Sequence, residues 1–463
     1  MDNSEIFVGL DIGTSSIKVV VAEAVTGKVN VIGVGSQRSE GVSRGVIVDI
    51  DKASESIKAA ISKAEQQANL KIEDVVINIP SSMLKIEPCQ SMIAVGTQSR
   101  EITEDDVRQV MTAAMVQNLQ GQSEVVTLKP LKFSVDGFSN IRDPRGMIGV
   151  RLEMNGILYT APRNIVYNLQ SAVKKAGLNI SHEVVAPVAL SNIALSEGER
   201  NFGSIIIEMG AGQTSASVIH DKSLKMTEVD YEGGNHITHD ISVVLNTNVE
   251  NASHYKIYYG NADSNLVSDN EVFPAEIVGK NEPENVSTKY LSEIIEARLE
   301  QIFSRLKTKL EESNALDLPG GIIITGGVAA TPGIDSLASR IFQVNTKVYI
   351  PQQVGMRYPA FSIGLGDVYY AAMLSDIDKI ANSIVTGNSI DLGGNQAAKE
   401  PTNTQGLMGR FTNKKDSPQP KSTKETNNPA VDRQKPEVNN QSVDNKTKKT
   451  GNAVKGFWNK FFD

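Results

Sequence analysis

Residues 7–22 read Phe7-Val8-Gly9-Leu10-Asp11-Ile12-Gly13-Thr14-Ser15-Ser16-Ile17-Lys18-Val19-Val20-Val21-Ala22. An apolar run reaches an acid, turns through a glycine and hydroxyl residues, and leaves as a second apolar run, which predicts a strand, a tight turn and a returning strand. Gly13 can adopt backbone angles closed to other residues, so the N–H groups of the turn can converge on an anion, with the hydroxyls of Thr14 and Ser15 as further donors. Asp11 suits a hydrated divalent cation and Lys18 suits a phosphate oxygen. For this stretch alone, a polar β-hairpin without a ligand is the alternative.

The same layout returns about two hundred residues later. Residues 204–219 run from an apolar strand through Glu208 and the turn Gly210-Ala211-Gly212-Gln213 into an alternating strand that begins at Thr214. A dinucleotide-binding Gly-x-Gly turn would have to open a helix, and here a strand follows. The chain contains no Gly-Lys-Ser or Gly-Lys-Thr, so a P-loop is excluded. Two such hairpins facing each other would hold the two sides of a polyphosphate.

A third glycine turn ends a buried strand at residues 321–329. This stretch reads Gly321-Ile322-Ile323-Ile324-Thr325-Gly326-Gly327-Val328-Ala329, and a helix is predicted from Ile334. A flat, bulky group can approach a Gly-Gly backbone closely. Taken alone, the segment is also compatible with an ordinary strand-to-helix turn.

Length, composition and the pattern between these motifs predict an α/β protein. With 463 residues, 40% of them apolar, the chain is long enough for two or more domains. Its net charge of -8 argues against nucleic acid as the main partner. A single cysteine, Cys89, excludes an intrachain disulfide and favours a reducing compartment, and the first residues lack the features of a signal peptide. Residues 82–160 interrupt the alternating rhythm and predict a compact α+β insert.

The last eighty residues differ in character. Between residues 383 and 450, Gly, Asn, Gln, Pro, Ser, Thr and Lys dominate, which predicts a disordered linker. Residues 451–463 then place apolar side chains at i, i+3, i+4, i+7 and i+8, with lysines outside that stripe: Val454, Phe457, Trp458, Phe461 and Phe462, beside Lys455 and Lys460. A basic amphipathic helix with Trp and Phe on one side is typical of an interfacial membrane anchor. A motif that folds into a partner's groove is the alternative.

The three glycine motifs resemble the first phosphate, second phosphate and adenosine motifs of the actin-like ATPase superfamily. Within it, the chain is similar to the FtsA family of bacterial cell-division proteins, on the evidence of the insert, the tail and the run Glu232-Gly233-Gly234-Asn235-His236-Ile237-Thr238-His239-Asp240-Ile241. The resemblance implies an actin-like duplicated ATPase fold of the α/β class. Its first half would span residues 1–200, including the insert at 82–160. The second half would span 201–382, followed by the linker at 383–450 and a membrane-targeting helix at 451–463.

The resemblance also implies a site for ATP and Mg2+. The nucleotide-binding residues would be Asp11, Gly13, Thr14, Ser15, Lys18, Glu208, Gly210, Gly212, Gln213, Thr214, Gly233, Gly234, Gly326 and Gly327. Asp11 and Glu208 would hold Mg2+ through water. The superfamily usually has aspartate in place of Glu208 and glycine in place of Ala211, so we expect nucleotide binding with, at most, slow ATP hydrolysis. Gln213 and Glu208 are the candidates for a catalytic role.

Two further features of the second half carry alternatives. His236 and His239 could suggest a metal site, but with no third ligand nearby a structural role beside the nucleotide turn is favoured. A helix is predicted at residues 288–312, and Arg298, Arg305 and Lys309 fall together on one of its sides. These basic residues are either a solvated surface or, as the resemblance implies, the landing site of the C-terminal peptide of FtsZ.

Three classes of function fit these features. The first is a structural adaptor that polymerises at the cytoplasmic face of the cell membrane, at the division site, attaches FtsZ to an anionic membrane surface and recruits later division proteins. The second is a small-molecule kinase of the same fold, and the third is a chaperone-type ATPase. A kinase has no use for an amphipathic tail, and a chaperone should carry a folded substrate domain where this chain has a linker. The sequence therefore favours the adaptor.

Overall fold

The computed structural model describes residues 4–25, 27–118 and 123–387. The linker beyond residue 387 and the amphipathic helix predicted at residues 451–463 lie outside this part of the chain. In the described residues, no helix combines the length and apolar character needed to cross a membrane.

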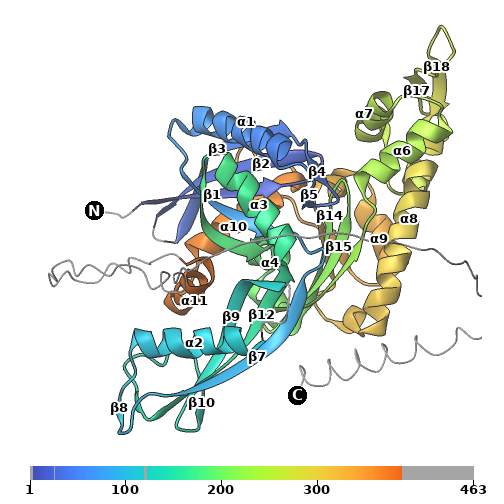
Figure 1. The fold of residues 1–463 in the computed structure, drawn as a ribbon. Helices are drawn as coiled ribbons and strands as arrows, with labels where there is room; N and C mark the ends of the chain where they lie inside the picture. Colours follow the sequence, from blue (N-terminus) through green and yellow to red (C-terminus); the bar gives the residue numbers. More distant parts are fainter. Residues whose placement is uncertain (1–3, 26, 119–122, 388–463) are drawn as a thin grey trace, which may run out of the picture. The chain divides into compact units, whose positions relative to one another are not determined.

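Two five-stranded sheets with the same strand order form the framework (Figure 1). In each, an antiparallel three-stranded meander continues, beside its first strand, into two parallel strands. The first sheet has the order β13-β6-β1-β2-β3, with β1 (Glu5–Ile12), β2 (Ser16–Val25), β3 (Lys28–Arg38), β6 (Asp74–Ile79) and β13 (Asn179–Val185). The second has the order β16-β15-β14-β19-β20, with β14 (Ser204–Met209), β15 (Thr214–His220), β16 (Ser223–Asp230), β19 (Ile322–Thr325) and β20 (Thr346–Val348). This repetition is the duplication that the sequence predicts.

Helices cover both faces of the first sheet. Residues 19–22 of β2 are all fully buried, although successive side chains of a strand point to opposite faces. Val20 and Ala22 join the apolar core formed with α10, whereas α1 lies along β3, where glycines let its backbone approach closely. The helices of this half are α1 (Ile50–Ala68), α3 (Arg163–Lys175), α4 (Ala186–Ala194) and α10 (Ser362–Ala372), with the small hairpin β4 (Val42–Ser43) and β5 (Val46–Ile47). Helix α5 (Glu197–Phe202) instead packs against β15 of the second sheet.

The second sheet carries a larger helical part. Helix α8 packs its buried row of apolar residues against α6, α9 and β16. The remaining elements of this half are α6 (Gly234–Val244), α7 (Val249–Tyr259), η1 (Ser264–Leu266), β17 (Val272–Ala275), β18 (Glu284–Ser287), α8 (Thr288–Glu312), η2 (Ala315–Asp317), η3 (Gly327–Ala330), α9 (Ile334–Phe342) and η4 (Pro359–Phe361).

The insert forms a four-stranded antiparallel sheet of its own, in the order β10-β9-β12-β7, packed against α2. Helix α2 begins with a reciprocal cap, because the Thr103 N–H donates to Asp106 Oδ2 over 2.9 Å and the Asp106 N–H donates to Thr103 Oγ1 over 3.4 Å. The elements are β7 (Lys85–Ala94), β8 (Arg100–Glu101), α2 (Glu104–Asn118), β9 (Ser123–Val135), β10 (Phe138–Ile141), β11 (Ile148–Gly149) and β12 (Arg151–Pro162).

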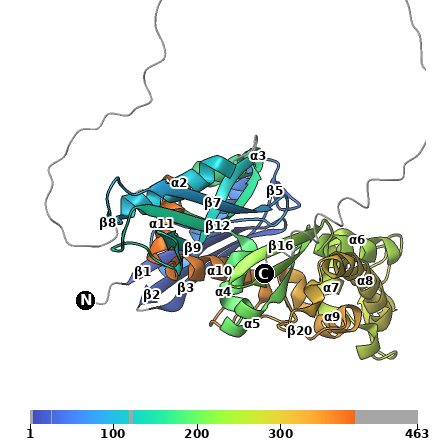
Figure 2. The same cartoon turned by 90° about the horizontal axis from the view of Figure 1, so that it is seen from below.

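The predicted boundary at residue 383 is wrong, because helix α11 (Asp376–Thr386) runs through it. Ser375 caps the start of this helix, and Gly387 ends it with a φ of 73°. The polar composition near residue 383 concealed the helix, whose apolar residues on one side join the core of the insert: Ile377, Ile380 and Ala381. A salt bridge of 2.8 Å between Lys129 of β9 and Asp378 adds to this contact, and Figures 1 and 2 show α11 beside α2 and β9.

Helix α10 also departs from the predicted division of the chain. We expected residues 201–382 to form the second half, but α10 packs its Leu365 and Val368 against Val20 and Ala22 of the first sheet. The chain therefore returns to the first half after completing the second. The periodicity of apolar residues cannot show such a return, because it indicates which side of a helix is buried but not which sheet that side packs against.

Candidate functional site

The predicted glycine turns come together on the walls of one cleft of about 840 Å³, within the range of roughly 300–1,000 Å³ that is typical of small-molecule sites. Most of the residues predicted to bind nucleotide line this cleft: Asp11, Gly13, Thr14, Ser15, Lys18, Glu208, Gly210, Gly212, Gln213, Gly234, Gly326 and Gly327. The two exceptions, Thr214 and Gly233, lie behind its wall.

The first turn joins β1 and β2, so that Asp11 and Lys18 face each other across the hairpin. Lys18 Nζ lies 3.3 Å from Asp11 Oδ2, and both side chains are nearly buried. Thr14 Oγ1 accepts a hydrogen bond of 3.0 Å from the N–H of Gly45, which ties the turn to the β4–β5 hairpin. The first turn thus presents a carboxylate and an ammonium group to the same cleft.

The second turn places the half-buried Glu208 at the end of β14, on the wall of the cleft. Burial raises the pKa of Glu208 to about 8, the negative charge of Asp11 adds to this effect, and Lys18 opposes it. Two like charges in a dry site are unfavourable unless a cation compensates them. The pair of carboxylates therefore fits Mg2+, which keeps several of its waters and needs only one or two carboxylates from the protein. Asp11 and Glu208 are the residues that would hold it.

The two turns approach each other closely. A Cβ at Gly212 would lie 2.8 Å from Thr14 Oγ1, which leaves no room for a side chain. Next to it, Gln213 packs against Gly45 and is 8% exposed. Its Oε1 has no hydrogen-bond partner within the described residues. A buried acceptor of this kind suits a water molecule beside the phosphates, which agrees with the catalytic role predicted for Gln213.

Thr214 and Gly233 support the second turn from behind. Thr214 Oγ1 donates to the Glu232 carbonyl over 2.9 Å, and a Cβ at Gly233 would lie 2.4 Å from the Gly210 carbonyl oxygen. The Gly233 N–H donates to His236 Nδ1 over 3.2 Å, so His236 has the structural role favoured from the sequence. In the described part of the chain, no cluster of three or more potential ligands could hold a metal ion.

The two glycines of the third turn differ from each other. Gly326 has a φ of 96°, and a Cβ there would lie 2.5 Å from the Met209 carbonyl oxygen. Gly327 instead has open space, since a Cβ at this position would meet only Ala360 Cβ, at 3.9 Å. The fold therefore requires Gly326, whereas Gly327 keeps the cleft open.

Helix α7 contributes cleft residues that the sequence did not indicate, among them Glu250, Ser253, His254 and Lys256. Lys256 Nζ donates to the Gly234 carbonyl over 2.8 Å and to Thr238 Oγ1 over 2.7 Å. Burial lowers the pKa of Lys256 to about 8. No glycine turn or acidic motif marks α7, so local pattern could not have assigned it to the cleft.

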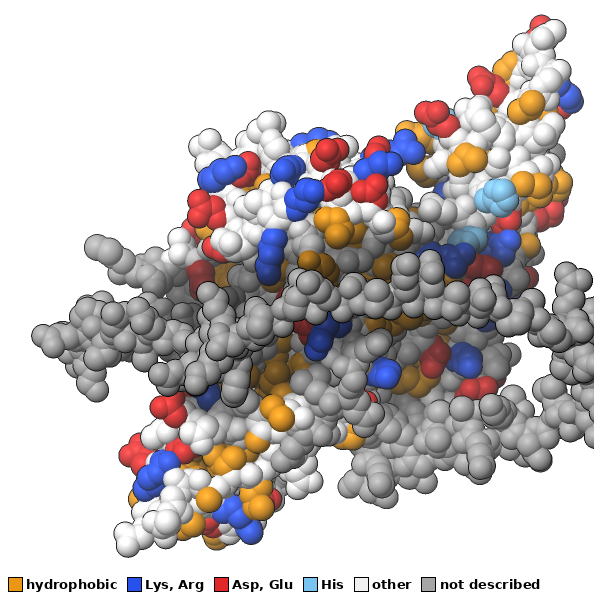
Figure 3. Space-filling view, in the orientation of Figure 1, with side chains coloured by type: hydrophobic (Ala, Val, Ile, Leu, Met, Phe, Trp, Pro, Cys, Tyr) orange, Lys and Arg blue, Asp and Glu red, His pale blue; other side chains and the backbone are white. Residues whose placement is uncertain are grey.

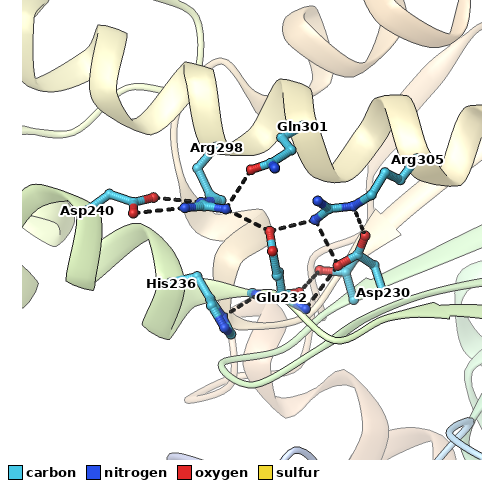
Figure 4. A network of polar contacts seen from close by, with 9 residues as sticks. Asp230, Glu232, His236, Asp240, Arg298, Gln301 and Arg305 are labelled. Carbon is cyan, nitrogen blue, oxygen red and sulfur yellow. Dashed lines mark hydrogen bonds and ion pairs between the residues drawn. The ribbon is translucent and has the colours of Figure 1, made fainter. Parts of the chain in front are cut away.

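The basic residues of α8 do not form a free surface (Figure 4). Arg298 holds Asp240 and Glu232, and Arg305 holds Asp230 and Glu232. Burial acts to raise the pKa of Glu232, but hydrogen bonds from Arg305 and Arg298 outweigh it and keep that pKa below its usual range. The third residue, Lys309, is exposed and lies 4.0 Å from Glu312. Arg298 is half-buried and Arg305 is partly exposed, and a peptide at this place would meet guanidinium groups that are already paired, so the landing site stays a prediction.

Comparisons with known proteins agree with this architecture. The family model described as "Cell division protein FtsA" matches residues 205–366, and the model "SHS2 domain inserted in FTSA" matches residues 81–160. The cell division protein FtsA of Enterococcus hirae is 45% identical over 463 residues, which is 100% of both chains. That of Bacillus subtilis strain 168 is 38% identical over 371 residues, 80% of this chain and 84% of the relative.

A solved structure supports the fold independently. The structure named "PilM-PilN type IV pilus biogenesis complex" superposes with a TM-score of 0.55 at 16% identity, covering 80% of this chain and 99% of that one. At this identity the likeness concerns the fold alone. The sequence identities, the family models and the duplicated sheets with their insert together lead to one conclusion: the chain belongs to the FtsA family of cell division proteins.

Proposed function

We propose that this protein binds Mg-ATP, polymerises at the cytoplasmic face of the cell membrane at the division site, anchors FtsZ filaments there and recruits later division proteins. The observation that carries the nucleotide part is the meeting of two acid–glycine turns, with the buried Asp11 and the half-buried Glu208 on the wall of one cleft. Backbone N–H groups in such turns suit phosphate oxygens, and the two carboxylates suit a hydrated Mg2+.

We expect ATP turnover to be slow. Glu208 is one methylene longer than the aspartate usual in the superfamily, and it lines the cleft together with Asp11, whose charge acts to raise the pKa of Glu208. A water molecule held by Gln213 would have to be placed accurately for attack, and small displacements reduce rates strongly. Nucleotide binding tolerates the same displacement better, so the protein acts as a nucleotide-dependent adaptor.

Membrane attachment rests on the sequence of residues 451–463. Burying their apolar side chains would contribute on the order of 8–13 kcal/mol, whereas ordering about ten residues costs on the order of 10 kcal/mol. Each lysine adds roughly 1 kcal/mol on anionic lipid. One tail therefore holds weakly, and many tails on one polymer hold firmly, because linked sites multiply affinity.

Self-assembly has support on the described surface as well. The insert exposes large apolar side chains, among them Met92 at 57%, Phe138 at 76% and Ile148 at 71%. Figure 3 shows hydrophobic side chains gathered over the insert, at its lower left. Exposed apolar groups that gather in one place mark interaction sites more often than isolated ones do. A polymer contact through the insert would cover them.

The FtsZ peptide has two candidate contacts on the second half. The first is the row of arginines on α8, which an acidic residue of the peptide could reach only in competition with Glu232 and Asp240. The second is the exposed apolar side chains of the neighbouring helices α6 and α7 that do not line the cleft, namely Val243, Val244 and Tyr258. Because α6 packs against α8, a peptide with apolar and acidic residues could use both.

Lipid co-sedimentation tests the proposal as a whole. The full chain and a chain ending at residue 450 are compared on anionic vesicles, each with and without Mg-ATP. We expect attachment of the full chain only, strengthened by Mg-ATP through polymerisation. Equal sedimentation of the shortened chain would contradict the anchor, and indifference to Mg-ATP would contradict nucleotide-dependent assembly.

A further inference from the structure

Glu232 links helix α8 to the nucleotide cleft (Figure 4). Its Oε2 accepts hydrogen bonds from Arg298 NH1 over 2.9 Å and from Arg305 NH2 over 2.5 Å. Each arginine also holds a further carboxylate with two nitrogens. Arg298 holds Asp240 of α6 over 2.6 and 2.9 Å, and Arg305 holds Asp230 of β16 over 2.5 and 3.1 Å.

The other side of Glu232 is fixed to the second phosphate turn. Its carbonyl accepts the hydroxyl of Thr214, and its N–H donates to Asp230 Oδ1 over 3.0 Å. The residues that follow it continue the contact: the Gly234 N–H donates to the Gly210 carbonyl over 3.0 Å, and the Asn235 N–H donates to the Ala211 carbonyl over 2.8 Å. A short path of hydrogen bonds thus connects two arginine side chains to the wall of the cleft.

These contacts differ from ordinary surface ion pairs, which contribute little. The Glu232 and Arg298 side chains are 24% and 21% exposed. Bidentate contacts between a guanidinium group and a carboxylate fix the orientation of the two side chains in addition to their distance. Helix α8, which carries both arginines, is held in place because its apolar residues from Leu291 to Leu310 are buried. Removing one arginine would leave partly buried carboxylates without a partner.

We propose that Arg298 and Arg305 are positioning residues for the nucleotide. Acting through Glu232, they hold the Gly233–Gly234 segment against the Gly210–Gly212 turn, so that the wall of the cleft is formed before the ligand arrives. This inference rests on the proposed binding of nucleotide. It gives the two arginines a task inside the protein that is separate from contact with a peptide.

Calorimetric titration with Mg-ADP provides the test, together with the thermal midpoint of each ligand-free protein. Arg298→Lys and Arg305→Lys keep the charge but lose the planar fork. Glu232→Gln keeps the shape and one acceptor oxygen. We expect each variant to bind Mg-ADP about tenfold more weakly, equivalent to ~1.4 kcal/mol, with the Glu232→Gln variant as the mildest.

Arg340→Lys is the matched control. Arg340 of α9 contacts Glu296 and Glu300 of α8 and Asp263, so it is also an arginine held by three acids against the same helix. It does not line the cleft. We expect Arg340→Lys to lower the thermal midpoint as much as Arg298→Lys does while leaving Mg-ADP affinity unchanged.

The outcomes separate this inference from the proposed function. If the unsubstituted protein binds Mg-ADP and both arginine variants bind it equally well, the arginines are structural and the inference is overturned. It is also overturned if affinity falls equally in the Arg340→Lys control. If the unsubstituted protein binds no Mg-ADP, the proposed function itself is overturned, and the inference with it.

Discussion

Asn78 donates its side-chain amide to Asp367 Oδ2 over 3.0 Å and to the Leu10 carbonyl over 3.3 Å, joining β6 to α10 and to the strand that leads into the first phosphate turn. Asp367 is fully buried, and its Oδ1 has no hydrogen-bond partner within the described residues. Burial raises the pKa of Asp367 well above its usual range; the hydrogen bond from Asn78 opposes this, and the charge of Asp11 adds to it. The buried Asp367 of α10 is therefore connected, through Asn78, to the strand that precedes the first phosphate turn.

Asp367→Asn should change how stability depends on pH. Because the folded-state pKa of Asp367 is raised, its contribution to stability is fully present below the unfolded pKa of about 3.9 and is lost as pH rises through the folded pKa. Asparagine does not titrate and can still accept the hydrogen bond from Asn78. Relative to the unsubstituted protein, the variant should therefore gain stability as the pH rises above the unfolded pKa of the carboxyl, as followed by urea unfolding.

Asp367→Leu serves as the control for that experiment. It removes the acceptor and leaves one amide hydrogen of Asn78 unpaired, which costs about 1–3 kcal/mol. We expect this loss at every pH. A constant difference between the Asp367→Asn variant and the unsubstituted protein across the pH range would show that Asp367 does not titrate.

The neighbouring glycines of the third turn should respond differently to substitution. Gly326→Ala meets the Met209 carbonyl and a positive φ, so we expect a loss of at least ~1–3 kcal/mol in stability. Gly327→Leu finds open space, so the protein should fold normally while its side chain fills the place of the adenosine group. Thermal unfolding and calorimetry with ATP distinguish the two. Unaltered ATP affinity in Gly327→Leu would show that the adenosine group does not lie at this turn.

A peptide that uses the arginines of α8 should compete with the nucleotide. To bind Arg298, an acidic residue must displace Asp240 or Glu232, and Glu232 supports the second phosphate turn. We expect saturating Mg-ADP to weaken binding of the FtsZ C-terminal peptide about fivefold or more, and the peptide to weaken Mg-ADP binding by the same factor. Fluorescence anisotropy of a labelled peptide measures the first effect. Equal affinities with and without Mg-ADP would place the peptide on the apolar residues of α6 and α7.

Trp458→Glu should release the protein from membranes, since it puts a charge into the apolar stripe of residues 451–463. Mg-ATP binding should be retained, because the linker predicted from the sequence separates this segment from the residues of the glycine turns. Lys455→Glu combined with Lys460→Glu should weaken attachment more on anionic than on neutral lipid. Vesicle flotation gives the answer. A Trp458→Glu variant that floats like the unsubstituted protein would show that the segment is not an anchor.

The parts of the site that could be predicted from the sequence are those in which contiguous residues form one turn. The hairpins at Gly13 and Gly212 have this property, because a strand, an acid and a glycine are adjacent along the chain. The repeated order of strands in the two sheets follows from the same hairpins.

What could not be predicted depends on partners far apart in sequence. Asn78 and Asp367 are 289 positions apart, and neither belongs to a recognisable motif. Lys256 reaches the cleft from a helix without any glycine signature. The sequence shows Arg298 and Arg305 on one side of a predicted helix. It does not show that the carboxylates that pair with them, Asp240 and Asp230, come from α6 and β16. Side-chain periodicity shows which residues share a side of a helix, and tertiary packing decides what they meet.

The packing of α11 against the core of the insert determines where a pull on the C-terminal end of the chain acts. Residue 387 follows α11 directly, so tension in the chain beyond it acts on this helix and on its contacts, which include those of Ile377, Ile380 and Ala381 in the core of the insert. The salt bridge between Lys129 and Asp378 lies on the same load path. A force applied through the tail is thus shared between the core of the insert and strand β13 of the first sheet, because the Asn382 side chain of α11 donates a hydrogen bond of 3.5 Å to the Ser181 carbonyl of that strand.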